Sequence, residues 1–261
     1  MAAPLRLLHL TDTHLLGDRY ARLRGVESFA TLQAVREHAT KQFGEIDGTL
    51  LTGDLVHDDA RGYALIREAF KDSSTPVYCI PGNHDIPDAM YHALSDAPFS
   101  VAQVNTVGNW VIVLINTWVA NSADGEIGKD QLREIDAILS EHSDHHVLLC
   151  LHHHPIPMGS NWLDRVGLRD ALDFTTCIAK HTNVRGVLWG HVHQALDTVI
   201  DKVRYMSTPS TCAQFLPHSA QFAVDNKPPG YRTLELMPDG KINTQVNWLE
   251  QVALRTAGQS L

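Results

Sequence analysis

Five segments of the chain place aspartate, asparagine or histidine directly after an apolar run. Most of these runs are rich in leucine, valine and isoleucine, which is typical of strands buried on both faces. The polar segments are Thr11-Asp12-Thr13-His14, Thr52-Gly53-Asp54, Gly82-Asn83-His84-Asp85, His152-His153-His154-Pro155 and Gly190-His191-Val192-His193. Ligands of open α/β sheets gather at the carboxyl ends of strands. We therefore expect these side chains to meet at one site.

The spacing and the residue types favour metal binding. Asp12 and His14, like His191 and His193, lie two residues apart, so on extended chain each pair points to one side. Imidazole with a few carboxylate oxygens suits iron, manganese, zinc or cobalt, whereas calcium prefers more oxygen ligands. One residue or pair from each strand end gives too many ligands for one ion. The set suits two ions with a bridging carboxylate, which can clamp a phosphoryl group.

Each pattern also has an ordinary explanation when it stands alone. Glycine, asparagine and aspartate are common turn residues, and a single Asp-x-His arises easily by chance. The ordered appearance of all five segments is what favours a metal site. His57 follows Gly53-Asp54 in a predicted loop and could lie behind the ligands. The other histidines are expected on the surface or in packing: His9, His38, His92, His142, His145, His181 and His218.

Length and composition predict one domain over residues 1–261, because the chain has no linker-like or repeated segment. The formal net charge of −9 argues against nucleic-acid binding through phosphates. The run Leu5–Leu10 is too short for a signal peptide, and no stretch approaches the roughly 20 apolar residues of a membrane span. Four cysteines without CxxC pairing fit a reducing compartment. We expect a cytoplasmic monomer or homodimer that does not bind membranes.

The alternation of apolar runs with helical patterns predicts an α/β protein with a mixed sheet system, strands inside and helices outside. Strands are expected at Leu5–Leu10, Thr49–Thr52, Val77–Ile80, Trp110–Asn116, His146–Leu151 and Val184–Trp189. Helical spacing links Val26, Phe29, Leu32 and Val35, and also Ile127, Leu132, Ile135 and Leu139. Later antiparallel strands are expected at Thr198–Met206, Tyr231–Met237 and Lys241–Trp248.

The order and spacing of the polar segments resemble the motif series of calcineurin-like metallophosphoesterases. Further segments resemble one branch of that family, the bacterial 3′,5′-cyclic AMP phosphodiesterases: Asn161-Trp162-Leu163-Asp164, Thr208-Pro209-Ser210-Thr211-Cys212 with Phe215 and Pro217-His218, and the run from Pro229 to Leu236. The resemblance covers nearly the whole chain. It implies a four-layer αββα sandwich of two mixed β-sheets, with the metal centre between the sheet edges.

The resemblance also implies a ligand set for two metal ions. Asp12, His14 and His193 would hold one metal, usually iron. Asn83, His153 and His191 would hold the other, usually manganese, iron or zinc, and Asp54 would bridge the two. His153 is expected within the triple histidine because the family ligand lies two residues before Pro155. Strand alternation would then turn His152 and His154 to the other side.

The implied activity is hydrolysis of cyclic AMP to 5′-AMP by a hydroxide held between the metals. His84 is the expected catalytic acid, because histidine exchanges protons near neutral pH. Asp85 is expected to cap the turn or to orient His84. The implied substrate contacts are His14, Asp54, Asn83, His84, His153 and His193.

Two alternatives stay open at this point. An enzyme with the same centre could act on glycerophosphodiesters, cyclic GMP, nucleotides or other phosphomonoesters, because one fold serves many substrates. A non-catalytic interaction module is the more remote alternative. Residues 155–165 and 208–218 are expected to form the surface that selects the substrate.

Overall fold

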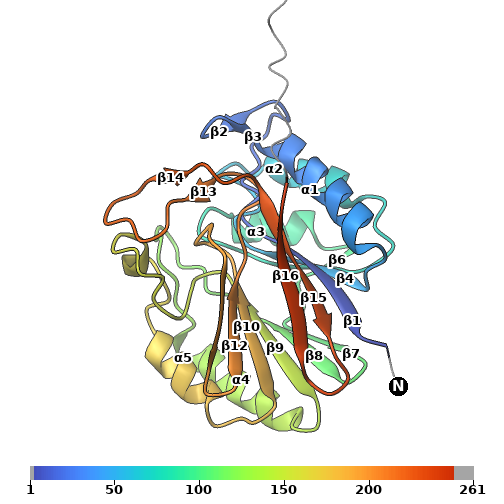
Figure 1. Ribbon diagram of the computed structural model, residues 1–261, viewed down its shortest axis with the longest axis vertical. Helices are drawn as coiled ribbons and strands as arrows, with labels where there is room; N and C mark the ends of the chain where they lie inside the picture. The colour runs from blue at the N-terminus through green and yellow to red at the C-terminus, as the bar shows by residue number, and fades with distance from the viewer. Residues whose placement is uncertain (1–2, 250–261) are drawn as a thin grey trace, which may run out of the picture.

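The computed structural model describes residues 3–249 (Figure 1). Two six-stranded sheets lie face to face, with helices on their outer sides, so the predicted αββα sandwich is confirmed. The first sheet has the order β16 (Ile242–Trp248), β15 (Gly230–Leu236), β1 (Leu5–Leu10), β4 (Gly48–Thr52), β5 (Val77–Ile80) and β6 (Phe99–Ser100). The second has the order β11 (Leu196–Ile200), β12 (Val203–Ser207), β10 (Val184–Trp189), β9 (His146–Leu151), β8 (Trp110–Leu114) and β7 (Val104–Val107).

The helices divide between the two outer faces. Against the first sheet pack α1 (Ser28–Phe43), α2 (Gly62–Phe70) and α3 (Pro87–Ala93), and against the second pack α4 (Gly128–Glu141) and α5 (Ala171–Ile178). A 3₁₀ turn, η1, covers Leu163–Arg165. Two short hairpins pair β2 (Arg22–Leu23) with β3 (Val26–Glu27), and β13 (Gln214–Phe215) with β14 (Val224–Asp225).

Alternating side chains separate the four layers. In β1, Leu8 and Leu10 pack toward the helices of the first sheet, whereas Leu7 belongs to the cluster between the sheets. That middle cluster also contains Leu50 and Leu148, one from each sheet. The sheets are therefore joined by a continuous apolar layer, which fixes how the strand ends of one sheet face those of the other.

Parallel pairing puts the functional strand ends at common edges. In the first sheet β1, β4 and β5 are parallel neighbours, and in the second sheet β9 and β10 are parallel neighbours. The carboxyl ends of parallel strands lie on one side of a sheet. All five polar segments follow these five strands, so the fold itself explains their convergence.

Most of the predicted strands are confirmed to within two residues, but one is wrong. The single strand expected over Thr198–Met206 is a hairpin of β11 and β12. Its turn residues, Asp201 and Lys202, have φ angles of 48° and 75°, the geometry of a two-residue turn with two left-handed positions. Neither residue is glycine or asparagine, so the turn carried no strong sequence signal.

Three helices, α2, α3 and α5, were not individually expected. Val26, which was assigned to the first helical pattern, lies in β3 instead. The prediction of one domain over residues 1–261 stays a prediction, and residues 1–2 and 250–261 lie outside the described residues. Between residues 3 and 249, no helix has both the length and the apolar character needed to cross a membrane.

A buried arginine links the two sheets near their polar edge. Arg232 of β15 is 1% exposed, and burial lowers its pKa to about 10. It donates hydrogen bonds to the carbonyls of Leu196 (2.8 Å) and Ser207 (2.7 Å) and to the hydroxyl of Thr208 (3.3 Å). Asp197 lies 3.6 Å from its guanidinium. Arg232 of the first sheet therefore donates hydrogen bonds to backbone carbonyls at the edge of the second sheet.

Replacing this arginine should destabilise the fold. Arg232→Met removes the donor from the buried carbonyl of Ser207 and the partly buried carbonyl of Leu196, and we expect the free energy of unfolding to fall by about 1–3 kcal/mol. Arg232→Lys is the matched control, because it keeps the charge but offers fewer donors and should lose less. Urea unfolding followed by circular dichroism measures both. If the Met variant were as stable as the parent, the free-energy cost of burying the guanidinium charge would equal the stabilisation from its hydrogen bonds.

Candidate metal centre

The loops after β1, β4 and β10 adopt an unusual backbone. Asp12, His14, Asp54, His191 and His193 all have positive φ angles, between 46° and 65°. Residues other than glycine rarely adopt this left-handed region, and such strain clusters at functional sites. Backbone bonds secure it, because Asp12 N and His14 N donate to the carbonyls of Gly53 (3.0 Å) and Asp54 (2.9 Å). The pairing of β1 with β4 thus continues into the site.

Asp12, His14 and His193 form the first group of candidate ligands. The Nε2 atoms of His14 and His193 lie 3.0 Å apart, and His193 Nε2 lies 3.3 Å from Asp12 Oδ1. His193 Nδ1 lies 2.5 Å from the carbonyl of Ala213, which can only accept a hydrogen bond. The proton therefore sits on Nδ1, and Nε2 presents its lone pair to the group, as metal-binding histidines do.

Asp54, Asn83, His152 and His191 form the second group. His152 Nε2 lies 3.3 Å from Asn83 Oδ1 and 3.4 Å from Asp54 Oδ1. Its Nδ1 donates to the carbonyl of Thr52 at 2.7 Å, so Nε2 is free to act as a ligand. The Nε2 atom of His191 is buried and has no hydrogen-bond partner among the described residues. A buried nitrogen without a partner is explained if it binds an ion.

The alternation argument for the triple histidine was wrong. β9 ends at Leu151, so the strand geometry does not extend through the triple. The rings of His152, His153 and His154 all crowd the ring of His191, with centroids 5.0, 4.7 and 5.7 Å away. The contacts to Asp54 and Asn83 belong to His152.

His153 shares a candidate group with His152 and His191, but its Nδ1 has a separate partner. Its Nδ1 pairs with Thr117 Oγ1 at 2.8 Å, and a Cβ added to Gly125 would lie 2.2 Å from that nitrogen. Its Nε2 is buried without a partner in the described part of the chain. The geometry thus favours His152 over the expected His153 as the ligand next to Asn83.

The carboxylate of Asp54 lies between the two groups. Its Oδ1 is near His152, and its Oδ2 lies 3.6 Å from His14 Nε2. Burial alone raises the pKa of Asp54, but His152 and His14 outweigh it and hold that pKa well below the usual range. Burial likewise lowers the pKa of His152, and the Asp54 charge outweighs it and raises that pKa. The negative charge at this point favours a cation, whether a proton on His152 or a metal ion.

Most of the other imidazoles are set up as neutral ligands. Burial, reinforced by neighbouring histidines, lowers the pKa values of His14 and His191 well below the usual range. Neutral imidazole is the form that binds metals. The candidate donors are two carboxylates, one amide oxygen and several imidazoles. Two of the imidazoles, those of His152 and His193, donate a hydrogen bond from Nδ1 to a backbone carbonyl. This donor set fits a pair of borderline metal ions.

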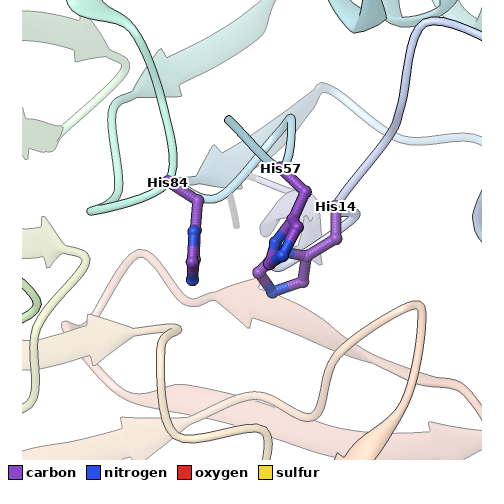
Figure 2. A group of neighbouring side chains, drawn as sticks. All are labelled: His14, His57 and His84. Carbon is purple, nitrogen blue, oxygen red and sulfur yellow. The ribbon is translucent and has the colours of Figure 1, made fainter. Parts of the chain in front are cut away.

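Three imidazoles lie together at the edge of the groups. Figure 2 shows His14, His57 and His84 from separate loops, with their side chains pointing the same way. The ring centroids of His57 and His84 are 4.2 Å apart, and His57 Nδ1 lies 3.1 Å from His14 Nδ1. His84 Nδ1 lies 3.1 Å from Asp58 Oδ2. Sequence reasoning missed Asp58, although it follows the Gly53-Asp54 segment closely.

Asp85 caps the turn, which confirms one of its two expected roles. Its carboxylate accepts hydrogen bonds from the backbone of Gly82 (2.9 Å), Leu55 (3.1 Å) and Val56 (3.2 Å) and from Tyr63 Oη (2.9 Å). The side-chain partner of His84 is Asp58 instead. Asp85 thus shapes the turn, and Asp58 positions the imidazole.

A pocket opens beside these groups, with a volume of about 170 Å³. Its lining includes His14, Asp54, Asn83, His84, His191 and His193. It also includes Arg24, Trp162, Phe215 and Phe222. Trp162 and Phe215 belong to the two segments that were expected to select the substrate. The substrate contact expected at His153 is not among the lining residues of this pocket.

Comparisons with known proteins place the chain in a family. The profile of the calcineurin-like phosphoesterases matches residues 5–195. Two relatives are named 3′,5′-cyclic adenosine monophosphate phosphodiesterase CpdA. The Escherichia coli K12 protein is 40% identical over 249 residues, covering 95% of this chain and 90% of its own. The Haemophilus influenzae protein is 35% identical over 249 residues, covering 95% and 91%.

Solved structures agree on the fold. A dimetal phosphatase from Danio rerio has a TM-score of 0.63 at 14% identity, covering 90% of this chain and 96% of that one. At that identity the likeness concerns the fold alone. The profile match over most of the chain and the relatives above 30% identity lead to one conclusion: the chain belongs to the calcineurin-like phosphoesterase family.

Proposed function

We propose that this protein hydrolyses 3′,5′-cyclic AMP to 5′-AMP. The observation that carries the proposal is identity of 33–40% to cyclic AMP phosphodiesterases over nearly the whole chain. The same chain gathers its aspartates and histidines into two adjoining groups beside a pocket. The net reaction adds one water molecule. A new P–O bond forms, the P–O3′ bond breaks, and O3′ receives a proton.

The proposed cofactor is a pair of metal ions, iron with manganese, iron or zinc. Asp12, His14 and His193 would hold one ion, Asn83, His152 and His191 the other, and Asp54 would contact both. When bound, such a pair supplies positive charge to the phosphate and lowers the pKa of water. The surrounding protein keeps His14 and His191 neutral and holds the candidate ligands largely buried.

His84 is the proposed proton donor. The leaving 3′ alkoxide is strongly basic, so its departure requires a proton. His84 is half-buried at the pocket, and Asp58 holds its Nδ1, which leaves Nε2 to donate to O3′. Its backbone N–H also donates to Asp54 Oδ1 at 2.8 Å, which fixes the acid relative to the proposed bridging carboxylate.

We also propose that the protein is a cytoplasmic monomer or homodimer that binds neither nucleic acids nor membranes. The same centre could hydrolyse other phosphodiesters or phosphomonoesters, because the metal ligands do not contact the part of the substrate beyond the phosphate.

The function is tested with a panel of phosphoesters. Protein supplied with Mn²⁺ or Fe²⁺ should convert cyclic AMP to 5′-AMP faster than it hydrolyses glycerophosphodiesters or phosphomonoesters. Chromatography of the products distinguishes 5′-AMP from 3′-AMP. Preferential turnover of a phosphomonoester would assign a different substrate class, and no turnover with either metal would favour an interaction module.

The choice between neighbouring histidines is tested by metal content. His152→Ala should bind the second ion at least 100-fold more weakly, because it removes the nitrogen beside Asn83 and Asp54. His153→Ala is the matched control, since it removes an equally buried ring and should retain both ions. Elemental analysis of dialysed protein measures the ratio, and circular dichroism checks folding. If only the His153 variant lost an ion, His153 would be the ligand, as expected from the sequence.

His84→Ala should separate metal binding from proton transfer. We expect kcat for cyclic AMP to fall by about 10²–10⁴, the usual contribution of a general acid. The loss should be much smaller for bis(p-nitrophenyl) phosphate, whose phenolate leaves without a proton, and the metal content should be unchanged. His92→Ala, an exposed histidine of α3, is the control. Equal losses on both substrates would make His84 a phosphate-positioning residue.

A further inference from the structure

Three aromatic rings line the same pocket as the candidate ligands. Trp162, Phe215 and Phe222 meet edge to face, with ring centroids 5.2 to 5.3 Å apart. Phe215 also stacks on the imidazole of His193, at 3.9 Å between centroids and 7° between planes. These three rings, the aromatic wall, meet at angles of 70° to 81° and extend from the proposed ligand His193 to Phe222.

Two features of the aromatic wall are unexplained by packing alone. Phe222, in the segment that joins β13 to β14, is 44% exposed. The Nε1 atom of Trp162 is buried and has no hydrogen-bond partner among the described residues. An exposed ring and an unused donor at the same pocket are what a flat polar ligand would need.

An arginine covers the outermost ring. The guanidinium carbon of Arg24 lies 4.4 Å from the ring centroid of Phe222 and 5.7 Å from that of Phe215. Within residues 3–249, its side chain makes no hydrogen bond or ion pair that would hold it elsewhere. It is the only Lys or Arg that lines the described pocket of an otherwise acidic protein.

The position of Arg24 is held by a strained turn. Arg24 and Gly25 form the tip of the β2–β3 hairpin, with φ angles of 52° and 84°. A two-residue turn of this kind prefers asparagine, aspartate or glycine at its first position. Arginine there breaks a local rule, and its side chain contacts the pocket rings, which is typical of a functional position.

We propose that the aromatic wall and Arg24 bind the base of the nucleotide. The base would stack on Phe222, with the guanidinium of Arg24 on its other face and Trp162 Nε1 donating a hydrogen bond to its edge. Bases commonly stack on aromatic rings and on arginine planes. Arg24 is exposed and unpaired, so its side chain can lift from the ring to admit the base. This proposal rests on the proposed function.

The layout of a nucleotide matches the layout of the pocket. A nucleotide carries a charged phosphate at one end and a flat base at the other, joined by one sugar. The candidate ligands and Phe222 line one pocket, and Phe215 packs against both His193 and Phe222. The aromatic wall would therefore bind the base, whereas the metal centre would contact only the phosphate.

The test compares a ligand with a base and one without it. Calorimetry with the metal-loaded protein should show 5′-AMP binding roughly 5- to 150-fold more tightly than ribose 5-phosphate, which is the usual contribution of one stacked base. Phe222→Leu should remove most of this ratio and leave ribose 5-phosphate binding unchanged. In turnover, the loss should appear in KM for cyclic AMP rather than in kcat.

Two further variants sharpen the result. Trp162→Phe keeps the ring and removes the donor, so it should weaken 5′-AMP binding by a smaller factor. Tyr20→Leu is the matched control, because Tyr20 is a highly exposed aromatic residue that does not line the pocket. Equal affinities for 5′-AMP and ribose 5-phosphate, with cyclic AMP still hydrolysed, would overturn the base site alone. Absence of cyclic nucleotide hydrolysis would instead overturn the proposed function.

Discussion

The buried negative charge of Asp54 is the constraint on which the site depends. A carboxylate removed from water must be balanced by nearby cations or donors. Here the balance comes from His152 on one oxygen, His14 near the other and the backbone N–H of His84. Each partner follows a different strand, so the register of both sheets must be correct before the charge is compensated. A cation bound beside Asp54 would also supply local positive charge in a chain whose formal net charge is −9.

Much of this arrangement follows from sequence, and the exceptions have physical reasons. Apolar runs buried on both faces defined Leu5–Leu10 and Val77–Ile80 to the residue, and their polar ends identified most candidate ligands. The expectation of His153 came from a family pattern, and the strand alternation added to it does not extend beyond the end of β9. The contact between Asp58 and His84 depends on how two loops meet, and no local periodicity records it.

The proposed contacts to the base are separate from the candidate metal centre. The ligands lie on the loops that directly follow parallel strands, where the sheets hold them firmly. Arg24 and Phe222 lie instead on short hairpin segments outside both large sheets. Such connections tolerate change more readily than the core. Relatives with the same centre can therefore differ in the part of the substrate that lies beyond the phosphate.

The two candidate ligand groups each draw on both sheets. Asp12 and His14 follow β1 of the first sheet, whereas His193 follows β10 of the second, and 179 residues separate His14 from His193. An ion held by such a set acts as a cross-link that closes a very long loop, in the manner of a disulfide. Because the unfolded chain cannot assemble these ligands, ion binding also favours the folded state by mass action. Metal supply would then govern the lifetime of the protein as well as its activity.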